Sequence, residues 1–276
     1  MNYAQFFSSH EAKLEMVGED KENLIYVFRE LKDWSQLDFI LHQNQEVSSE
    51  DKQLLNEIFE QLKNHCSPQY ITGHAYFRNL ILTVDPHVLI PRPETEELVD
   101  LILSENSKAS LAILDIGTGS GAIAISLKQT RPDWIVTASD ISVKALQLAT
   151  KNARDYDLDI TFIESDIFSS ILGKFDIIVS NPPYIAYKDK SEVGTNVLVS
   201  EPHLALFADE DGFAIYRRII EGAQQRLTQN GKLYFEIGYK QGDTLRTFLT
   251  QQFPQKRIRV LKDGFGKDRM VVVDNG

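Results

Sequence analysis

The sequence of 276 residues has a single cysteine, an excess of acidic over basic residues and no long apolar run. With only Cys66 available, an internal disulfide is impossible, which suits a reducing compartment. The net charge of -11 disfavours a long nucleic-acid groove as the main partner surface. No apolar run approaches the ~18 residues that span a bilayer, and the N-terminus lacks a signal-peptide pattern. We therefore expect a soluble, cytoplasmic protein with no membrane contact.

The six histidines show no spacing typical of metal ligands, and we expect no metal site. Apolar residues make up 42% of the chain, as in an ordinary globular protein. At this length the chain suits one large domain, alone or with a smaller neighbour.

The first part of the chain has helical spacing of apolar residues. Leu24, Val27, Phe28 and Leu31 lie on one face of a helix, and "SSED" at 48–51 is a helix start. Residues 1–74 are therefore predicted to form a small helical domain.

A different pattern follows from residue 75 onward. "YFRNLILTVDPHVLI" alternates with period two and is broken at Asp85-Pro86, so residues 75–91 are predicted to be a hairpin that links two domains. Residues 92–276 start with a helix from about Glu94 and then alternate strand and helix. The predicted strands are 111–117, 134–140, 160–166, 175–181 and 231–238.

Such alternation predicts an α/β fold with a mostly parallel, doubly wound sheet. "RIRVLKD" and "DRMVVV" are too close together for a helical crossover, so they are predicted to pair antiparallel at the edge of the sheet.

A glycine-rich loop follows the first strand of this sheet. In "LDIGTGSGAIAISL", Gly117, Thr118, Gly119, Ser120 and Gly121 lie between a strand and a helix. Glycines there allow a ligand close to the backbone, and the helix start offers unpaired N–H groups. The pattern fits NAD and S-adenosylmethionine equally, so a dehydrogenase remains possible at this point.

Two acidic residues follow at the ends of the next strands. Asp140 is placed to accept hydrogen bonds from ribose hydroxyls, and Asp166, or the backbone after it, to meet an adenine. The alternative for each is a solvated strand end or a helix cap.

The fourth strand runs directly into Asn181, Pro182, Pro183 and Tyr184. Asn-Pro is common in turns, but the carboxyl ends of parallel strands share one crevice, so Asn181 is expected to open onto the same site as Gly117 and Asp140. The Asn181 side-chain oxygen and the Pro182 carbonyl can each accept one hydrogen bond from a planar amino group, and Tyr184 can cover a flat substrate. A dehydrogenase has no evident use for this tetrapeptide. The residues therefore indicate a methyl transferase that acts on an –NH₂ group.

The chain resembles the peptide chain release factor glutamine methyltransferases of the HemK/PrmC type. The resemblance is carried over residues 66–276 by "QYITGHAYFRNL", "VLIPRPETEELVD", "SNPPYI", "EPHLALFADEDG" and "FEIGYKQG". It implies a class I S-adenosylmethionine-dependent methyltransferase: a Rossmann-like, mostly parallel seven-stranded sheet with an antiparallel edge strand, plus the small helical domain.

The resemblance also implies N5 methylation of the glutamine in the Gly-Gly-Gln motif of bacterial class-1 release factors. It assigns cofactor contacts to residues 117–121, Asp140, Asp166, Ile167 and Asn181, and the grip on the glutamine to residues 181–184. The helical domain would recognise the release factor, with no direct contact to nucleic acid. Ile167 replaces what is often an aromatic residue in relatives.

Other classes stay open beside this one. Ribosomal-protein glutamine methyltransferases tend to carry Ser-Pro after the Pro-Arg pair, a nucleic-acid amino-methyltransferase predicts a basic face, and a non-catalytic module predicts loss of Asn181 or of a loop glycine. Arg92 and Glu94 are expected either to close over the cofactor or to cap the next helix.

Overall fold

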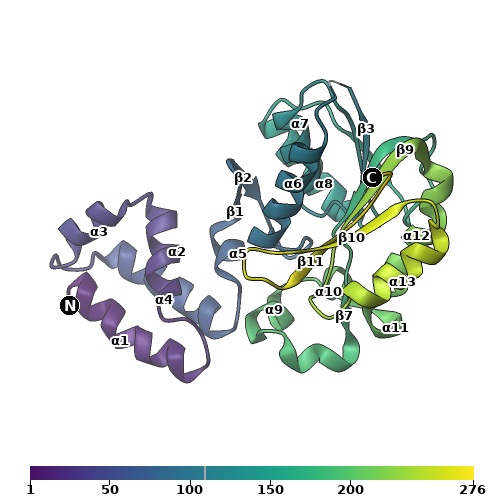
Figure 1. Ribbon diagram of the computed structural model, residues 1–276. Coiled ribbons are helices and arrows are strands. Elements are labelled where there is room, and N and C mark those ends of the chain that lie inside the picture. The colour runs from purple at the N-terminus through teal and green to yellow at the C-terminus, as the bar shows by residue number, and fades with distance from the viewer. Residues whose placement is uncertain (109) are drawn as a thin grey trace. The chain divides into compact units, whose positions relative to one another are not determined.

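The computed structural model describes residues 1–108 and 110–276, and these divide into two compact units (Figure 1). We call them the helical unit, residues 1–74, 84–86 and 191–201, and the sheet unit, residues 75–83, 87–190 and 202–276.

The helical unit is built from amphipathic helices around an aromatic core. Its helices are α1 (Tyr3–Met16), α2 (Asn23–Lys32), α3 (Gln36–His42), α4 (Ser49–Lys63), α5 (Pro68–Thr72) and α9 (Thr195–Ser200). The predicted helix start at "SSED" is confirmed, because the Ser48 side chain caps α4 by accepting the Asp51 N–H. Phe7, Phe28 and Leu55 are fully buried between α1, α2 and α4. The late segment 191–201 joins this unit, where the Ser67 and Ser200 hydroxyls are 2.7 Å apart.

The sheet unit has a twisted, mostly parallel central sheet. Within the described residues seven strands lie in the order β10-β11-β9-β6-β3-β4-β5. Their bounds are β3 (Ala112–Ile116), β4 (Ile135–Asp140), β5 (Thr161–Glu164), β6 (Phe175–Ser180), β9 (Leu227–Glu236), β10 (Arg257–Lys262) and β11 (Asp268–Asp274). Only β11 runs against its neighbours, pairing antiparallel with both β9 and β10. The predicted doubly wound sheet and its antiparallel edge pair are confirmed.

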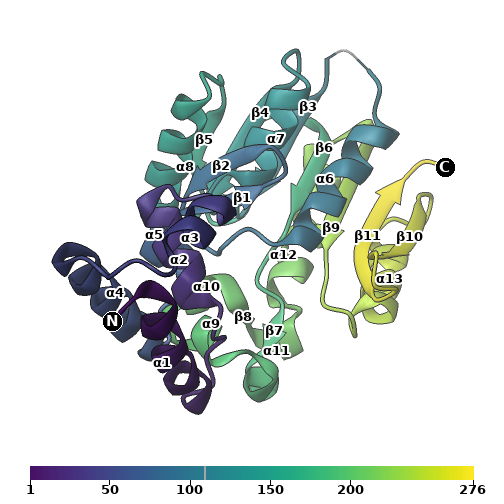
Figure 2. The same ribbon diagram turned by 90° about the vertical axis from the view of Figure 1, so that its left-hand side faces the viewer.

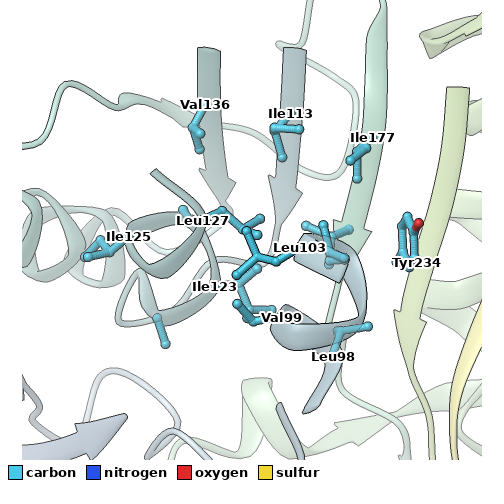
Figure 3. Packing of buried hydrophobic residues seen from close by; sticks show 14 of the residues in the cluster. Leu98, Val99, Leu103, Ile113, Ile123, Ile125, Leu127, Val136, Ile177 and Tyr234 are labelled. Carbon is cyan, nitrogen blue, oxygen red and sulfur yellow. The ribbon is translucent and has the colours of Figure 1, made fainter. Parts of the chain in front are cut away.

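Helices cover both faces of this sheet because its inner strands are apolar on both sides. Packed on one face are α6 (Pro93–Glu105), α7 (Ala122–Thr130) and α8 (Val143–Asp155), and on the other α12 (Ala214–Arg226) and α13 (Gly242–Gln252) (Figure 2). On the first face, Ile113 of β3 and Ile177 of β6 lie in one buried cluster with Leu103 of α6 and Ile123 of α7 (Figure 3). These layers hold the carboxyl ends of β3, β4, β6 and β9 in fixed relative positions.

Short elements complete the sheet unit. They are β1 (His74–Phe77) and β2 (Leu80–Thr83), β7 (Ile185–Ala186) and β8 (Phe207–Ala208), the 3₁₀ turn η1 (Tyr187–Glu192), α10 (His203–Leu206) and α11 (Asp209–Gly212). Two of them, β1 and η1, begin or end within residue ranges of the helical unit. The predicted hairpin is present as the pair β1-β2, and its turn lies at Arg78 and Asn79, ahead of Asp85-Pro86.

The strands that differ most from prediction are β9 and β5. Strand β9 begins at Leu227 and passes through Asn230-Gly231, a pair that predicts a turn, because the ladder to β6 is irregular there. Strand β5 ends at Glu164, so the expectation that Asp166 ends this strand is wrong. The Ser165 hydroxyl donates to the Ile167 carbonyl and accepts the Ser170 N–H, which turns the chain away from the sheet.

Candidate active site

The glycine loop is shaped by left-handed backbone at each of its glycines. Gly117, Gly119 and Gly121 have φ of 72°, 56° and 85°, a region that favours glycine. A Cβ on Gly121 would lie 2.8 Å from Ile125 Cδ1, the flexible end of that side chain, and 3.3 Å from Ala149 Cβ, so a larger residue here would make its neighbours shift. At Gly117 and Gly119 a Cβ would meet no atom within 4 Å. The loop backbone is therefore open to a ligand at these two positions.

Asp140 holds this loop to the neighbouring strand. Its Oδ2 accepts the Gly119 N–H at 2.9 Å, and its Oδ1 accepts the Ser142 N–H at 2.9 Å. The Gly117 and Thr118 N–H groups both donate to the Ser139 carbonyl. Burial raises the pKa of Asp140, while these backbone bonds lower it. Each carboxylate oxygen has a second lone pair for a ligand hydroxyl, so holding the loop and binding a ribose are compatible.

Asp115, the penultimate residue of β3, was missed by the sequence reasoning. It is fully buried, its Oδ2 accepts the Thr118 hydroxyl at 2.7 Å, and its Oδ1 has no hydrogen-bond partner among the described residues. Burial raises the pKa of Asp115 to about 7, and the Thr118 hydrogen bond opposes that shift. The signal for it was an acid inside an otherwise apolar strand directly before the glycine loop.

The remaining loop residues face inward. Thr118 and Ser120 are buried, and the Ser120 carbonyl accepts the Asn152 side-chain amide of α8 at 2.9 Å. Asn152 also bonds both backbone groups of Thr83, which ties the loop to strand β2.

Asp166 and Ile167 lie on the turn after β5. The Asp166 carboxylate is about half exposed and forms an ion pair with Arg218 of α12 at 2.7 Å. Ile167 is buried in the core with φ of 54°, which is costly for a β-branched residue. The Ile167 side chain packs inward, so the turn offers a ligand its backbone and the Asp166 side chain.

Asn181 comes directly after β6, beside the loop. Ile116, the last residue of β3, pairs with Ser139 on one side and with Ser180 on the other. The residues that follow these three paired positions, on adjacent parallel strands, are Gly117, Asp140 and Asn181. They therefore lie at the same edge of the sheet, as the sequence predicted. The strand order reverses between β3 and β6, which is where α/β sheets bind ligands.

A chain of hydrogen bonds holds the Asn181 side chain. Asn181 Nδ2 donates to Thr95 Oγ1 at 3.2 Å, and the Thr95 hydroxyl donates to Glu236 Oε2 at 2.5 Å. Thr95 lies in the first turn of α6, and Glu236 is the last residue of β9 and only 1% exposed. Sequence reasoning missed both as site residues, although an acid at the end of a strand was the signal used for Asp140.

The Tyr184 backbone is held from the opposite side. Its carbonyl accepts the Gln241 side-chain amide at 3.0 Å, and Gln241 Oε1 in turn accepts the Gly238 N–H at 2.9 Å. A Cβ on Gly212 would lie 2.2 Å from that same carbonyl oxygen. Residues 181–184 are therefore fixed at both ends, with Pro182 buried and Pro183 partly buried between them.

Comparison with known proteins decides the family. Residues 6–73 match the PrmC N-terminal domain, and residues 95–207 match the methyltransferase small domain. The chain is 57% identical to the release factor glutamine methyltransferase of Streptococcus pneumoniae over 100% of this chain and 99% of that protein. It is 50% identical to the Lactococcus lactis enzyme of the same name, over 92% and 94%. The chain belongs to the release factor glutamine methyltransferase family.

Solved structures of other methyltransferases share the fold of this protein. A methyltransferase from Pyrococcus furiosus matches with a TM-score of 0.56 at 18% identity, over 72% of this chain and 90% of that one. The expected class I methyltransferase fold, the enzyme class and S-adenosylmethionine as methyl donor are confirmed.

The residues present fit S-adenosylmethionine. The backbone at Gly117 and Gly119 is open, and α7 begins at Ala122 directly after the loop, so the N–H groups of its first turn lie next to it. Arg92 occupies the N-cap position of α6 without capping it through its side chain, and Glu94 lies in the first turn.

Among residues 1–108 and 110–276, no group of three or more His, Cys, Asp or Glu side chains is placed to hold a metal ion. In the same described residues no helix is long and apolar enough to cross a membrane.

Proposed function

We propose that this enzyme methylates the N5 amide nitrogen of the glutamine in the Gly-Gly-Gln motif of class-1 release factors, at the carboxyl ends of β3, β4 and β6. The observation that carries the proposal is the geometry of Asn181. Its Nδ2 is engaged by Thr95, so its Oδ1 is left as the acceptor beside the glycine loop. An acceptor in that place suits a substrate amide rather than a carboxylate.

The substrate amide is held by two acceptors. Asn181 Oδ1 and the Pro182 carbonyl each take one of its two hydrogens, which aims the nitrogen and increases its electron density. Tyr184, whose carbonyl Gln241 holds, lies beside the flat amide. These residues supply orientation, which an amide needs because its lone pair is delocalised.

The cofactor is held by the loop. We assign its contacts to residues 117–121, to the lone pairs of Asp140, to Asp166 with the Ile167 backbone, and to Asn181. S-adenosylmethionine supplies an activated methyl group, whose bond to sulfur breaks as the bond to nitrogen forms. The methylated amide nitrogen is strongly acidic and loses its proton to water or a carbonyl, so the proposal needs no dedicated base.

The helical unit is assigned to recognition of the release factor. Its residues 6–73 match the PrmC N-terminal domain, and the role is supported by the absence of any proposed cofactor contact from residues 1–74. The proposal places the reaction in the cytoplasm and involves no direct contact with nucleic acid, in keeping with the net charge of -11.

The test is methyl transfer to purified release factors from labelled S-adenosylmethionine, followed by mass mapping of the modified peptide. We expect a single added methyl on the motif glutamine. A release factor with that glutamine replaced by alanine is the control and stays unlabelled. Label on another residue, or on neither protein, would overturn the proposal.

A further inference from the structure

Glu236, Thr95 and Asn181 are joined by two hydrogen bonds. The charge of Glu236 decides which atom donates in each bond. An ionised Glu236 only accepts hydrogen bonds, so the single hydroxyl hydrogen of Thr95 is committed to Glu236 Oε2. Thr95 Oγ1 is then left as an acceptor, and it takes a hydrogen from Asn181 Nδ2. This order of donors turns Asn181 Oδ1 away from Thr95.

Protonation of Glu236 permits the opposite order. A carboxylic acid donates to Thr95 Oγ1, which frees the Thr95 hydrogen for Asn181 Oδ1. The Asn181 carboxamide then turns over and presents its NH₂ group to the substrate amide, where two sets of donors face each other. The shape of the site is unchanged, but its acceptor is lost.

Building on the proposed function, we propose that Thr95 and Glu236 are positioning residues, and that the ionised carboxylate of Glu236 keeps the Asn181 oxygen directed at the substrate. Glu236 does not touch the substrate and acts only through Thr95 and Asn181. The two residues come from "IPRPETE" and "FEIG", 141 positions apart, and meet only in the folded sheet unit.

The surroundings of Glu236 raise its pKa from the ordinary range of a carboxyl to near neutral pH. Burial raises the pKa of Glu236 to about 7, while the Thr95 bond, Arg269 of β11 and Arg92 lower it and Glu94 raises it. Tyr184 also faces it, and the Tyr216 hydroxyl of α12 donates to its backbone carbonyl at 2.7 Å. Because the ionised form is the productive one, activity is present above this pKa and lost below it.

The first experiment measures kcat with saturating cofactor and release factor from pH 6 to 9. We expect wild-type kcat to fall about tenfold per pH unit below about pH 7, and Glu236→Gln, which cannot titrate, to vary less than about twofold. The pKa of Asp115 is also about 7, and saturating cofactor keeps any effect of Asp115 on cofactor binding out of the measured kcat. An acid limb that survives in Glu236→Gln overturns the proposal.

Substitutions at Thr95 test the middle of the chain. Thr95→Val keeps the shape but removes the hydroxyl, and we expect kcat at pH 8 to fall about tenfold or more, with cofactor Kd and release factor KM within about threefold. Thr95→Ser restores the hydroxyl and most of the rate. Ser126→Ala is the matched control: it removes a buried hydroxyl of α7 that has no hydrogen-bond partner in the described part of the chain, and it leaves kcat unchanged. Equal rates for Thr95→Val and wild type contradict the positioning role.

A measurement without substrate distinguishes this proposal from the proposed function. The side-chain NH₂ signals of Asn181 are measured by NMR on the protein alone and are assigned by their loss in Asn181→Asp. We expect these signals to shift with a midpoint near pH 7 in wild type but not in Glu236→Gln. If the signals do not move between pH 6 and 8, the proposed control of Asn181 by Glu236 through Thr95 is overturned. If the signals titrate while no release factor is methylated, the proposed function fails, but the hydrogen-bond connection between Glu236, Thr95 and Asn181 is supported.

Discussion

The two halves of the candidate site are supported in different ways. The glycine loop is held by groups close in sequence: Asp115 is 3 positions from Thr118, and Asp140 is 21 from Gly119. The Asn181–Tyr184 segment is held by groups far away, with Thr95 86 positions from Asn181 and Gln241 57 positions from Tyr184. The continuous segment from β3 through α7 and β4 to α8 supplies most supports of the loop, including Asn152 on the Ser120 carbonyl, whereas the substrate half needs the whole sheet unit. Changes in the first half should therefore affect cofactor binding, and changes in the second should affect the rate of transfer.

The largest effect is expected at Asn181. Asn181→Ala removes the substrate acceptor, so methyl transfer should fall by about 10²-fold or more, a loss of about 2.7 kcal/mol of transition-state stabilisation. Cofactor Kd should change far less than the rate, because Asn181 is only one of the proposed cofactor contacts and the glycine loop keeps its own supports. Single-turnover kinetics and calorimetric titration measure the two quantities, and an unchanged kcat would refute the role of Asn181.

Asp140→Ala should mainly weaken cofactor binding, whereas Asn181→Ala should mainly lower the rate of transfer. It removes the acceptor for the Gly119 and Ser142 N–H groups together with the proposed ribose contact, so cofactor binding should weaken by about 1.5–3 kcal/mol. Asp100→Ala is the matched control: its carboxylate is exposed, pairs with Arg78 and has no proposed cofactor contact, so Kd should change by less than about twofold. Equal losses of affinity in the two variants would show that the loop supports do not matter.

Gly212→Ala tests the support of Tyr184. The new Cβ would lie 2.2 Å from the Tyr184 carbonyl oxygen, and the backbone has φ of 88°. Gly266→Ala has the same kind of backbone strain, with φ of 81°, but meets no atom within 4 Å. We expect Gly212→Ala to lose about 1–3 kcal/mol more free energy of unfolding than Gly266→Ala, and to lower kcat as well. Denaturant unfolding measures the first, and equal stabilities would mean that Tyr184 is not clamped there.

The smallest effect is expected at Thr118. Thr118→Ala removes the hydrogen bond to Asp115, at a cost of about 1 kcal/mol in stability at pH 8, where that carboxylate is ionised. Since this bond lowers the pKa of Asp115, its loss should raise the pKa above about 7. The stability difference from wild type should therefore shrink as the pH falls below 7 and Asp115 becomes neutral. Thr118→Ser keeps the bond and serves as control; an equal loss in both variants would exclude the hydroxyl as its cause.

Much of the sheet unit could be predicted because its signals are local. Alternation of apolar strands and amphipathic helices predicted the doubly wound sheet, and the short connection between "RIRVLKD" and "DRMVVV" required an antiparallel pair. The errors lie where non-local or side-chain bonds override local patterns: the Ser165 hydroxyl turns the chain before Asp166, and an irregular ladder to β6 carries β9 through Asn230-Gly231.

The sequence by itself determined the order of elements, the glycine loop and the placing of Gly117, Asp140 and Asn181 at one edge, since parallel strands end on the same side of a sheet. Only the tertiary structure decided which distant groups hold Asn181 and Tyr184. Spacing along the chain does not show that Thr95, Asn181 and Glu236 meet, because their contact depends on how α6 packs against β9 and on the register Ser180–Phe235 between β6 and β9. Burial of Glu236 at that junction, and with it the raised pKa, is a property of the packed interior and of no local segment.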